Sequence, residues 1–249
     1  MTIHIIGVDC ATENSKVGMA RGSLDRGVAR IDEVVVCDKD RSAADYIASW
    51  ISSTDPVLLA LDAPLGWPQP LGVSLASHRA GDELFVAPND IFRRATDRFT
   101  QRTLGKTPLD VGADRIARTA HAALRVLGEL RRRLGQPIPL AWSPELTAGI
   151  SAIEVYPAAT LGVWGIRASR YKNPDQVDER REIIAALRPH FVLPADVTVL
   201  EQNADALDSV VCLLCAKDFL LGQASPPDDL SLAAVEGWIW TRAPHVPQP

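Results

Sequence analysis

The sequence predicts an α/β fold whose mixed sheet is antiparallel at its start, parallel afterwards, and flanked by helices. Short apolar runs joined by brief polar turns open the chain, which is typical of an antiparallel meander. Later apolar runs, at 56–62 and 150–157, alternate with helical patterns, as in parallel strands joined by crossovers. With 249 residues, 47% of them hydrophobic, the chain can form a large core.

The opening run, Ile3–Val8, is rich in β-branched residues and indicates a buried strand that ends on Asp9. A polar turn follows, and the runs Val17–Ala20 and Val28–Val36 predict two further strands of the meander. A carboxylate at a strand end is costly to bury unless something compensates it. Asp9 is therefore a candidate site residue, although an Asx-type turn would also explain it.

Ser42 is a suitable cap for a helix with an apolar face from Ala43 to Ile51. The next apolar run begins at Pro56 and stops on Asp62, which repeats the pattern of the first strand. A helical crossover between the two strands would make them parallel and place both ends at one edge of the sheet. Asp9 and Asp62 are then expected to face one crevice, where open α/β sheets bind ligands.

Residues 67–149 interrupt the alternation of strands and helices and predict a mainly helical, basic insertion, with helices at 90–104 and 114–134. From Arg93 to Arg133 there are eleven basic and four acidic side chains, a net charge of +7, whereas the rest of the chain carries −12. This asymmetry suits a phosphate-bearing ligand gripped locally and argues against a protein that coats duplex nucleic acid. Four residues are candidates for facing the crevice, namely Arg94, Asp97, Asp114 and Arg115; salt bridges within the insertion are the alternative.

After the insertion, the run 150–157 predicts a further strand with Glu154 near its end, and 177–187 a charged helix. Asn203 is a suitable cap for a largely buried helix, on which Asp205 and Asp208 share one face. Helix capping alone could explain both acids. Cys212 and Cys215 lie within the same apolar helix and are interpreted as core residues. A late strand is expected at 236–240, and a proline-rich tail without structure at 242–249.

Each acid singled out here lies at a strand end or at the start of a buried helix. The set is Asp9, Asp62, Glu154, Asp205 and Asp208. If these side chains converge, their mutual repulsion would raise some of their pKa values unless a cation neutralises them. Carboxylates without a histidine or thiolate set favour Mg²⁺ or Mn²⁺. Two such ions could activate a water and stabilise the leaving oxyanion of a phosphodiester.

Five short motifs, in this order, resemble a known family. They are Gly7-Val8-Asp9 with Ala11, Leu61-Asp62-Ala63-Pro64-Leu65-Gly66, Arg94-Ala95-Thr96-Asp97, Glu154-Val155-Tyr156-Pro157-Ala158 and Asn203-Ala204-Asp205-Ala206-Leu207-Asp208-Ser209. The family is number 429 of the domains of unknown function, described as predicted nucleases of ribonuclease H-like fold. The helix from Asp205 to Asp208 also resembles the terminal acidic helix of bacterial Holliday-junction resolvases. By that resemblance Asp9, Asp62, Asp205 and Asp208 would hold two metal ions, while Glu154 would bind substrate or hold a neighbour.

The leading hypothesis is a single ribonuclease H-like domain that acts as a metal-dependent nuclease or phosphodiesterase. Its catalytic residues would be the five acids, and Arg94, Asp97, Arg115 and Lys172 would contact the substrate. One alternative is an actin-like nucleotide-binding phosphotransferase, weakened because no Gly-rich loop of the P-loop type is present. Another is a non-catalytic ribonuclease H-fold protein that binds a small anionic ligand.

A cytoplasmic location is expected from the sequence. The N-terminus has no basic leader, no later segment is long enough to span a bilayer, and the four cysteines are scattered. Nucleic acid or another phosphate-bearing ligand is the expected partner, and a membrane is not.

Overall fold

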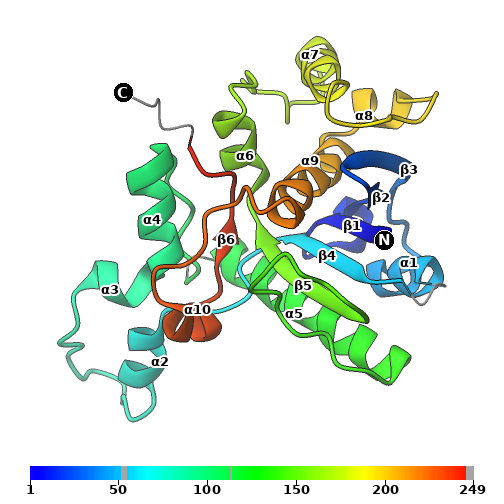
Figure 1. Ribbon diagram of the computed structural model, residues 1–249. Helices are drawn as coiled ribbons and strands as arrows, with labels where there is room; N and C mark the ends of the chain where they lie inside the picture. Colours follow the sequence, from blue (N-terminus) through cyan, green and yellow to red (C-terminus); the bar gives the residue numbers. More distant parts are fainter. Residues whose placement is uncertain (52–54, 113, 245–249) are drawn as a thin grey trace, which may run out of the picture.

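A mixed sheet forms the centre of the fold (Figure 1). The computed structural model describes residues 1–51, 55–112 and 114–244, and in this part of the chain the sheet has six strands in the order β3-β2-β1-β4-β5-β6. The strands are β1 (Ile3–Asp9), β2 (Gly18–Asp25), β3 (Val28–Val36), β4 (Val57–Asp62), β5 (Ile150–Val155) and β6 (Ile239–Trp240). Only β2 runs against the others. The predicted change from antiparallel to parallel pairing is confirmed.

The strand pairing places two acids side by side. β1 and β2 are joined through a short 3-10 helix, Asn14–Lys16, and β2 is longer than the run Val17–Ala20 had predicted. β4 pairs with β1 in parallel, and the register sets Asp9 directly opposite Asp62. The two strands therefore end at the same edge of the sheet, as the apolar runs had predicted.

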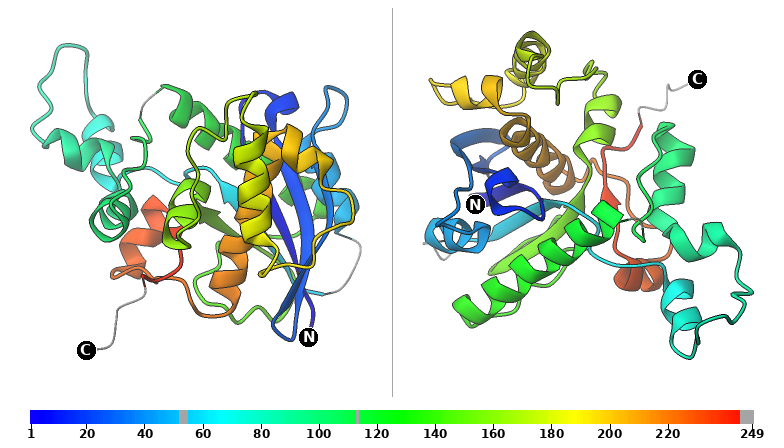
Figure 2. Two further views of the ribbon diagram at one scale, coloured as in Figure 1. Left: turned by 90° about the horizontal axis from the view of Figure 1, so that it is seen from above. Right: turned by 180° about the vertical axis from the view of Figure 1, so that it is seen from behind.

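One face of the sheet is covered by α9 (Ala204–Leu220), with α6 (Pro157–Val163), α7 (Val177–Leu187) and α8 (Thr198–Gln202) around it (Figures 1 and 2). The side chains of Ile5, Leu58 and Ile153 point to this face. Asn203 caps α9 by accepting a hydrogen bond from the N–H of Ala206 at 3.0 Å. Because α9 is buried on nearly every side, its Cys212 and Cys215 are core residues, as predicted.

The other face is covered by α1 (Ala43–Trp50) and α5 (Asp114–Leu134), which pack on Ile6, Val8 and Leu59. Ser42 caps α1 as predicted. The segment expected to form one insertion is thus divided: α5 belongs to this layer, because its apolar stripe meets the sheet. The remaining helices, α2 (Gln69–Leu75), α3 (Pro88–Phe92) and α4 (Ala95–Leu104), lie with α10 (Leu230–Glu236) beyond the β6 edge (Figure 1).

Two expectations are wrong in detail. The helix predicted at 90–104 is broken at Arg94, whose extended backbone (φ −74°, ψ 165°) precedes α4. The tail was expected to lack structure from residue 242, yet Arg242 forms a bridge with Ala224 and an ion pair with Asp218 at 2.8 Å. In both cases an arginine reaches a buried acid far away in the sequence, which no local pattern reveals. Residues 245–249 of the tail lie outside the described residues.

No helix in the described ranges has the length and apolar character that crossing a bilayer requires.

Candidate functional site

Four carboxylates gather where β1 and β4 end against α9. The two-residue period of a strand turns Asp9 and Asp62 to the face on which Ile5 and Leu58 meet α9. Asp9 is 9% exposed, and Asp208, on the second turn of α9, is 0% exposed. The side chain of Asp9 lies close enough to those of Asp62 and Asp205 to influence the pKa of both. The convergence expected from the sequence therefore holds for four of the five acids.

Two glycines allow α9 to lie directly on the strands. A Cβ atom at Gly7 would come within 2.1 Å of the backbone oxygen of Ser209, and one at Gly18 within 1.9 Å of that of Asp205. Any larger residue would push the first turns of the helix away from the sheet. The close approach of backbone to backbone is thus what brings Asp205 and Asp208 beside Asp9.

Burial and mutual repulsion shift the protonation of these acids. Burial, with the charges of Asp208 and Asp62, raises the pKa of Asp9 well above its ordinary value. Burial and Asp208 raise the pKa of Asp62 to about 7, although Lys172 opposes the change. Burial and Asp208 also raise the pKa of Asp205. At neutral pH the cluster therefore retains protons that ordinary carboxyl groups would have lost.

Asp208 is the only one of the four with a cation in direct contact among the described residues. The Lys172 ammonium lies 2.6 Å from its Oδ2, and the Tyr171 hydroxyl donates to its Oδ1 at 2.6 Å. Burial still leaves the pKa of Asp208 raised, against the effects of Lys172 and Tyr171. That Lys172 contacts a substrate stays a prediction. The structure shows that its ammonium pairs with the carboxylate of Asp208.

The loop that carries Tyr171 and Lys172 is held by a buried arginine. The guanidinium of Arg180, on α7, donates to the backbone oxygens of Tyr171 (2.6 Å), Asn173 (2.8 Å), Pro174 (3.0 Å) and Glu201 (2.6 Å). Arg180 is 1% exposed. It fixes the backbone from which Tyr171 and Lys172 reach Asp208, so we assign it a positioning role.

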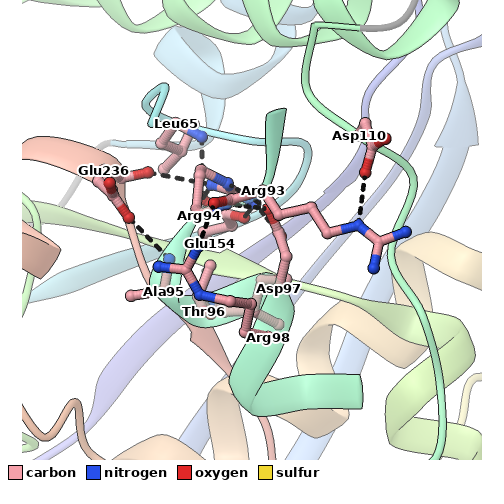
Figure 3. A network of polar contacts seen from close by, with 11 residues as sticks. Leu65, Arg93, Arg94, Ala95, Thr96, Asp97, Arg98, Asp110, Glu154 and Glu236 are labelled. Carbon is pink, nitrogen blue, oxygen red and sulfur yellow. Dashed lines mark hydrogen bonds and ion pairs between the residues drawn. The ribbon is translucent and has the colours of Figure 1, made fainter. Parts of the chain in front are cut away.

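Glu154, the fifth acid, points the other way. On β5, Ile153 and Val155 face α9, and the strand period therefore turns Glu154 to the opposite face. There the guanidinium of Arg94 binds both of its oxygens, at 2.8 and 2.9 Å, and the N–H of Leu65 donates at 2.9 Å (Figure 3). The sequence had left open whether Glu154 binds substrate or holds a neighbour, and this geometry favours the second reading.

The same network holds Asp97 and Glu236. Asp97 accepts from the side chain of Arg94 at 2.9 and 3.2 Å and from its backbone N–H at 2.9 Å. Glu236, on α10, accepts from the N–H groups of Gln69 (2.8 Å) and Ala95 (2.7 Å). Figure 3 shows these side chains turned toward one another between α4, α10 and β5. Arg94 and Asp97 were predicted to contact substrate. In the structure they form salt bridges with each other, and Arg94 also with Glu154, which agrees with the alternative explanation given in the sequence analysis.

A cleft of about 100 Å³ separates this network from the acid cluster. Asp62 and Tyr156 line it together with Glu154, while Leu109 and Ile116 come from the predicted insertion. The insertion therefore contributes to a wall of the crevice. Arg115, the remaining residue predicted to bind substrate, is exposed at the start of α5 and does not line this cleft.

Carboxylate oxygens, the donors that hard divalent cations prefer, are the only ligand type in the acid cluster. Burial and, after it, mutual repulsion raise the pKa values of Asp9 and Asp62, and a bound cation would relieve both effects, so the chemistry of the donors fits Mg²⁺ or Mn²⁺. No three Asp, Glu, His or Cys residues of the described chain are yet arranged as a group that could hold one ion. In the described chain, Lys172 and Tyr171 are the side chains that bind a carboxylate of the cluster, and both bind Asp208.

Sequence reasoning did not identify Tyr171, Arg180 or Glu236 as site or network residues. For Arg180 a signal exists, because the residue takes the first place in an i, i+3, i+4, i+7 stripe with Ile183, Ile184 and Leu187. An arginine on the apolar face of a helix must find acceptors inside the protein. The positions of Tyr171 and Glu236 follow no local pattern.

Comparison with known proteins gives a family and nothing further. No curated protein and no solved structure matches the chain. The sequence pattern of one family, described as protein of unknown function (DUF429), matches residues 7–231, a range that includes all four acids of the cluster. The chain therefore belongs to the DUF429 family.

Proposed function

We propose that this protein hydrolyses phosphodiester bonds and that Asp9, Asp62, Asp205 and Asp208 bind Mg²⁺ or Mn²⁺ for the reaction. The convergence of four carboxylates, of which Asp9 and Asp208 are buried and Asp62 and Asp205 are half-buried, beside the ammonium group of Lys172 carries this proposal. Such a cluster costs stability unless a cation compensates it, and perturbed carboxyl groups in a cleft are typical of functional sites.

The fold gives independent support. Three strands in a meander, a helix, a parallel strand and a late helix returning to the sheet are the order expected of the ribonuclease H-like architecture. Acids at the ends of the first strand and of its parallel neighbour, with two more on the returning helix, are the arrangement that the resolvase resemblance implies. We therefore propose a ribonuclease H-like fold as part of the same hypothesis.

In the reaction a water adds to phosphorus, the bond to the leaving oxygen breaks, and a proton ends on that oxygen. Two bound divalent ions, the number that the resolvase resemblance implies, would supply hydroxide near neutral pH and stabilise the leaving oxyanion. The chain itself would hold the ions through the four acids. Tyr171 orients Asp208 through its hydroxyl, and Arg180 holds the loop from which it does so.

The test is calorimetric titration with Mn²⁺ and Mg²⁺, followed by hydrolysis assays on single-stranded, duplex and branched DNA and RNA and on bis(p-nitrophenyl) phosphate. We expect Asp9→Asn and Asp208→Asn to abolish both metal binding and hydrolysis. Asp218→Asn is the matched control, because Asp218 is a buried acid of the same helix that pairs with Arg242 instead. Hydrolysis that persists unchanged in the two cluster variants would disprove the proposal.

A second candidate is a non-catalytic protein that binds a small anionic ligand in the crevice. The ion pair between Lys172 and Asp208 favours it, because part of the cluster is already compensated without a metal. Absence of metal binding in the titration, together with binding of a phosphate-bearing ligand, would select this candidate.

A further inference from the structure

A second and larger pocket lies beside the acid cluster. It has a volume of about 440 Å³ and is formed by the end of α4, the start of α6 and residues 166–172. This volume lies in the range of about 300 to 1,000 Å³ that is usual for small-molecule sites. Three cationic side chains, Lys106, Arg170 and Lys172, line the pocket, and no acidic residue does so within the described chain.

Two of these cations have no counter-ion. Lys106 and Arg170 are exposed, and neither forms an ion pair or a side-chain hydrogen bond with the described residues. Some exposed arginines are paired, for example Arg118 with Asp114 and Arg181 with Asp178, whereas Lys106 and Arg170 are unpaired and line the same pocket. Unpaired cations that converge on a concave surface create a positive potential, which attracts an anion.

The rest of the lining is small and apolar. Ala158, Ala159 and Gly162 form one wall, and Ile166 lies near them. A Cβ atom at Gly162 would meet nothing within 4 Å, so the wall is open there. A lining that combines cationic side chains with small apolar residues suits a ligand that combines a phosphate with a ring.

The pocket is connected to the acid cluster by two shared residues. Tyr171 and Lys172 line the pocket, and the same two side chains contact Asp208. A phosphate held by Lys106 and Arg170 would therefore lie next to the carboxylates. The Lys172 ammonium lies at the boundary between the pocket and the acid cluster, so it can pair either with a phosphate in the pocket or with Asp208.

We propose that this pocket binds one nucleotide unit of the substrate, with its phosphate on Lys106, Arg170 and Lys172 and its base against the wall of α6. The inference rests on the proposed function and narrows it to substrates that present a single nucleotide, such as a single-stranded end or a small nucleotide diester. A duplex would not enter a space of this size.

The experiment measures binding of adenosine 5′-monophosphate by calorimetry in EDTA, so that no metal is involved. Adenosine, inorganic phosphate and ribose 5-phosphate serve as separate probes. We expect the nucleotide to bind at least tenfold more tightly than any of the three. The double variant Lys106→Gln/Arg170→Gln should weaken nucleotide binding at least tenfold, since it removes two unpaired charges.

The matched control is Arg118→Gln/Arg125→Gln, which removes two charges from a different basic pocket of about 410 Å³ on α5. We expect binding to change less than twofold in this control. Equal weakening in both double variants, or nucleotide binding no tighter than that of inorganic phosphate, would overturn the inference. Absence of nucleotide binding at millimolar concentration would do so as well.

Failure of this inference and failure of the proposed function can be told apart. If nucleotide binding follows the expectation but Mn²⁺ produces no hydrolysis, the pocket stands and the proposed function fails. If hydrolysis occurs and Lys106→Gln/Arg170→Gln leaves KM unchanged, the proposed function stands and the pocket assignment fails.

Discussion

Two groups of acids lie on opposite faces of the sheet, and they differ in how their charge is compensated. Glu154 and Asp97 share the guanidinium of Arg94 through short hydrogen bonds. Among the described residues, the ammonium of Lys172 is the one cation in contact with Asp9, Asp62, Asp205 or Asp208, and Lys16 acts on Asp205 from a distance. The first group is built as a structural tie between α4, α10 and β5. The second retains excess negative charge, which is a cost to stability and is typical of sites that bind a cation.

The largest effect is expected from breaking the compensated group. Arg94→Met would leave Glu154 and Asp97 buried without a partner, so we expect a loss of about 3–5 kcal/mol in the free energy of unfolding. Urea denaturation measures this loss. Arg98→Met, four residues away on the exposed side of α4, should change stability by less than about 1 kcal/mol. Similar losses in both variants would contradict the role assigned to Arg94.

The uncompensated group should behave in the opposite way. The folded state holds a proton on Asp62 up to about pH 7, whereas the unfolded chain loses it near pH 4. The stability due to this proton is present in acid and is lost as pH rises from about 4 through 7. Asp62→Asn should therefore raise stability at pH 8 by about 2–4 kcal/mol in the absence of metal, and less at pH 5.

Thermal unfolding in EDTA at pH 5 and pH 8 tests this difference between the two groups. Glu154→Gln is the matched control, since its carboxylate is already paired and the variant should be less stable than the wild type. If Asp62→Asn is destabilised at pH 8 as strongly as Glu154→Gln, the charge of Asp62 is compensated as well as that of Glu154, and the proposed difference between the two groups of acids is wrong.

A smaller effect is expected from separating the cluster sterically. Gly18→Ala would place a Cβ atom against the backbone of Asp205, and we expect a loss of about 1–3 kcal/mol. Because α9 would shift, the variant should also weaken Mn²⁺ binding. Gly72→Ala is the control, since nothing lies within 4 Å of its Cβ position. Equal stability of the two variants would show that the close contact between β2 and α9 is not required.

The smallest effect concerns the single cation of the cluster. Lys172→Met leaves the ionised Asp208 with only the Tyr171 hydroxyl, and we expect a loss of about 1–2 kcal/mol at pH 8. The loss should become smaller as pH falls, because burial raises the pKa of Asp208 and protonation removes the charge that Lys172 compensates. Under the proposed function, Mn²⁺ should restore stability at pH 8. A loss independent of both pH and Mn²⁺ would contradict this account.

Much of the site could be predicted because its parts follow local rules. Each of Asp9 and Asp62 directly ends an apolar run, and Asn203 marks the start of the helix that carries Asp205 and Asp208. Strand direction and the two-residue period are enough to place Asp9 and Asp62 on the same edge and the same face. The same two-residue period applied to residues 150–155 predicts that Glu154 lies on the opposite face from Asp9 and Asp62, because Ile153 and Val155 face α9.

Local patterns along the chain were enough to predict most of the strands, the shared edge of Asp9 and Asp62, and the acidic start of α9, because these features depend on neighbouring residues. Which charges are compensated depends on the packing of the layers. Arg94 lies 60 residues from Glu154, and Lys172 lies 36 residues before Asp208. Pairing over such distances depends on how layers pack and on which buried groups have no other partner, and no local pattern contains that information.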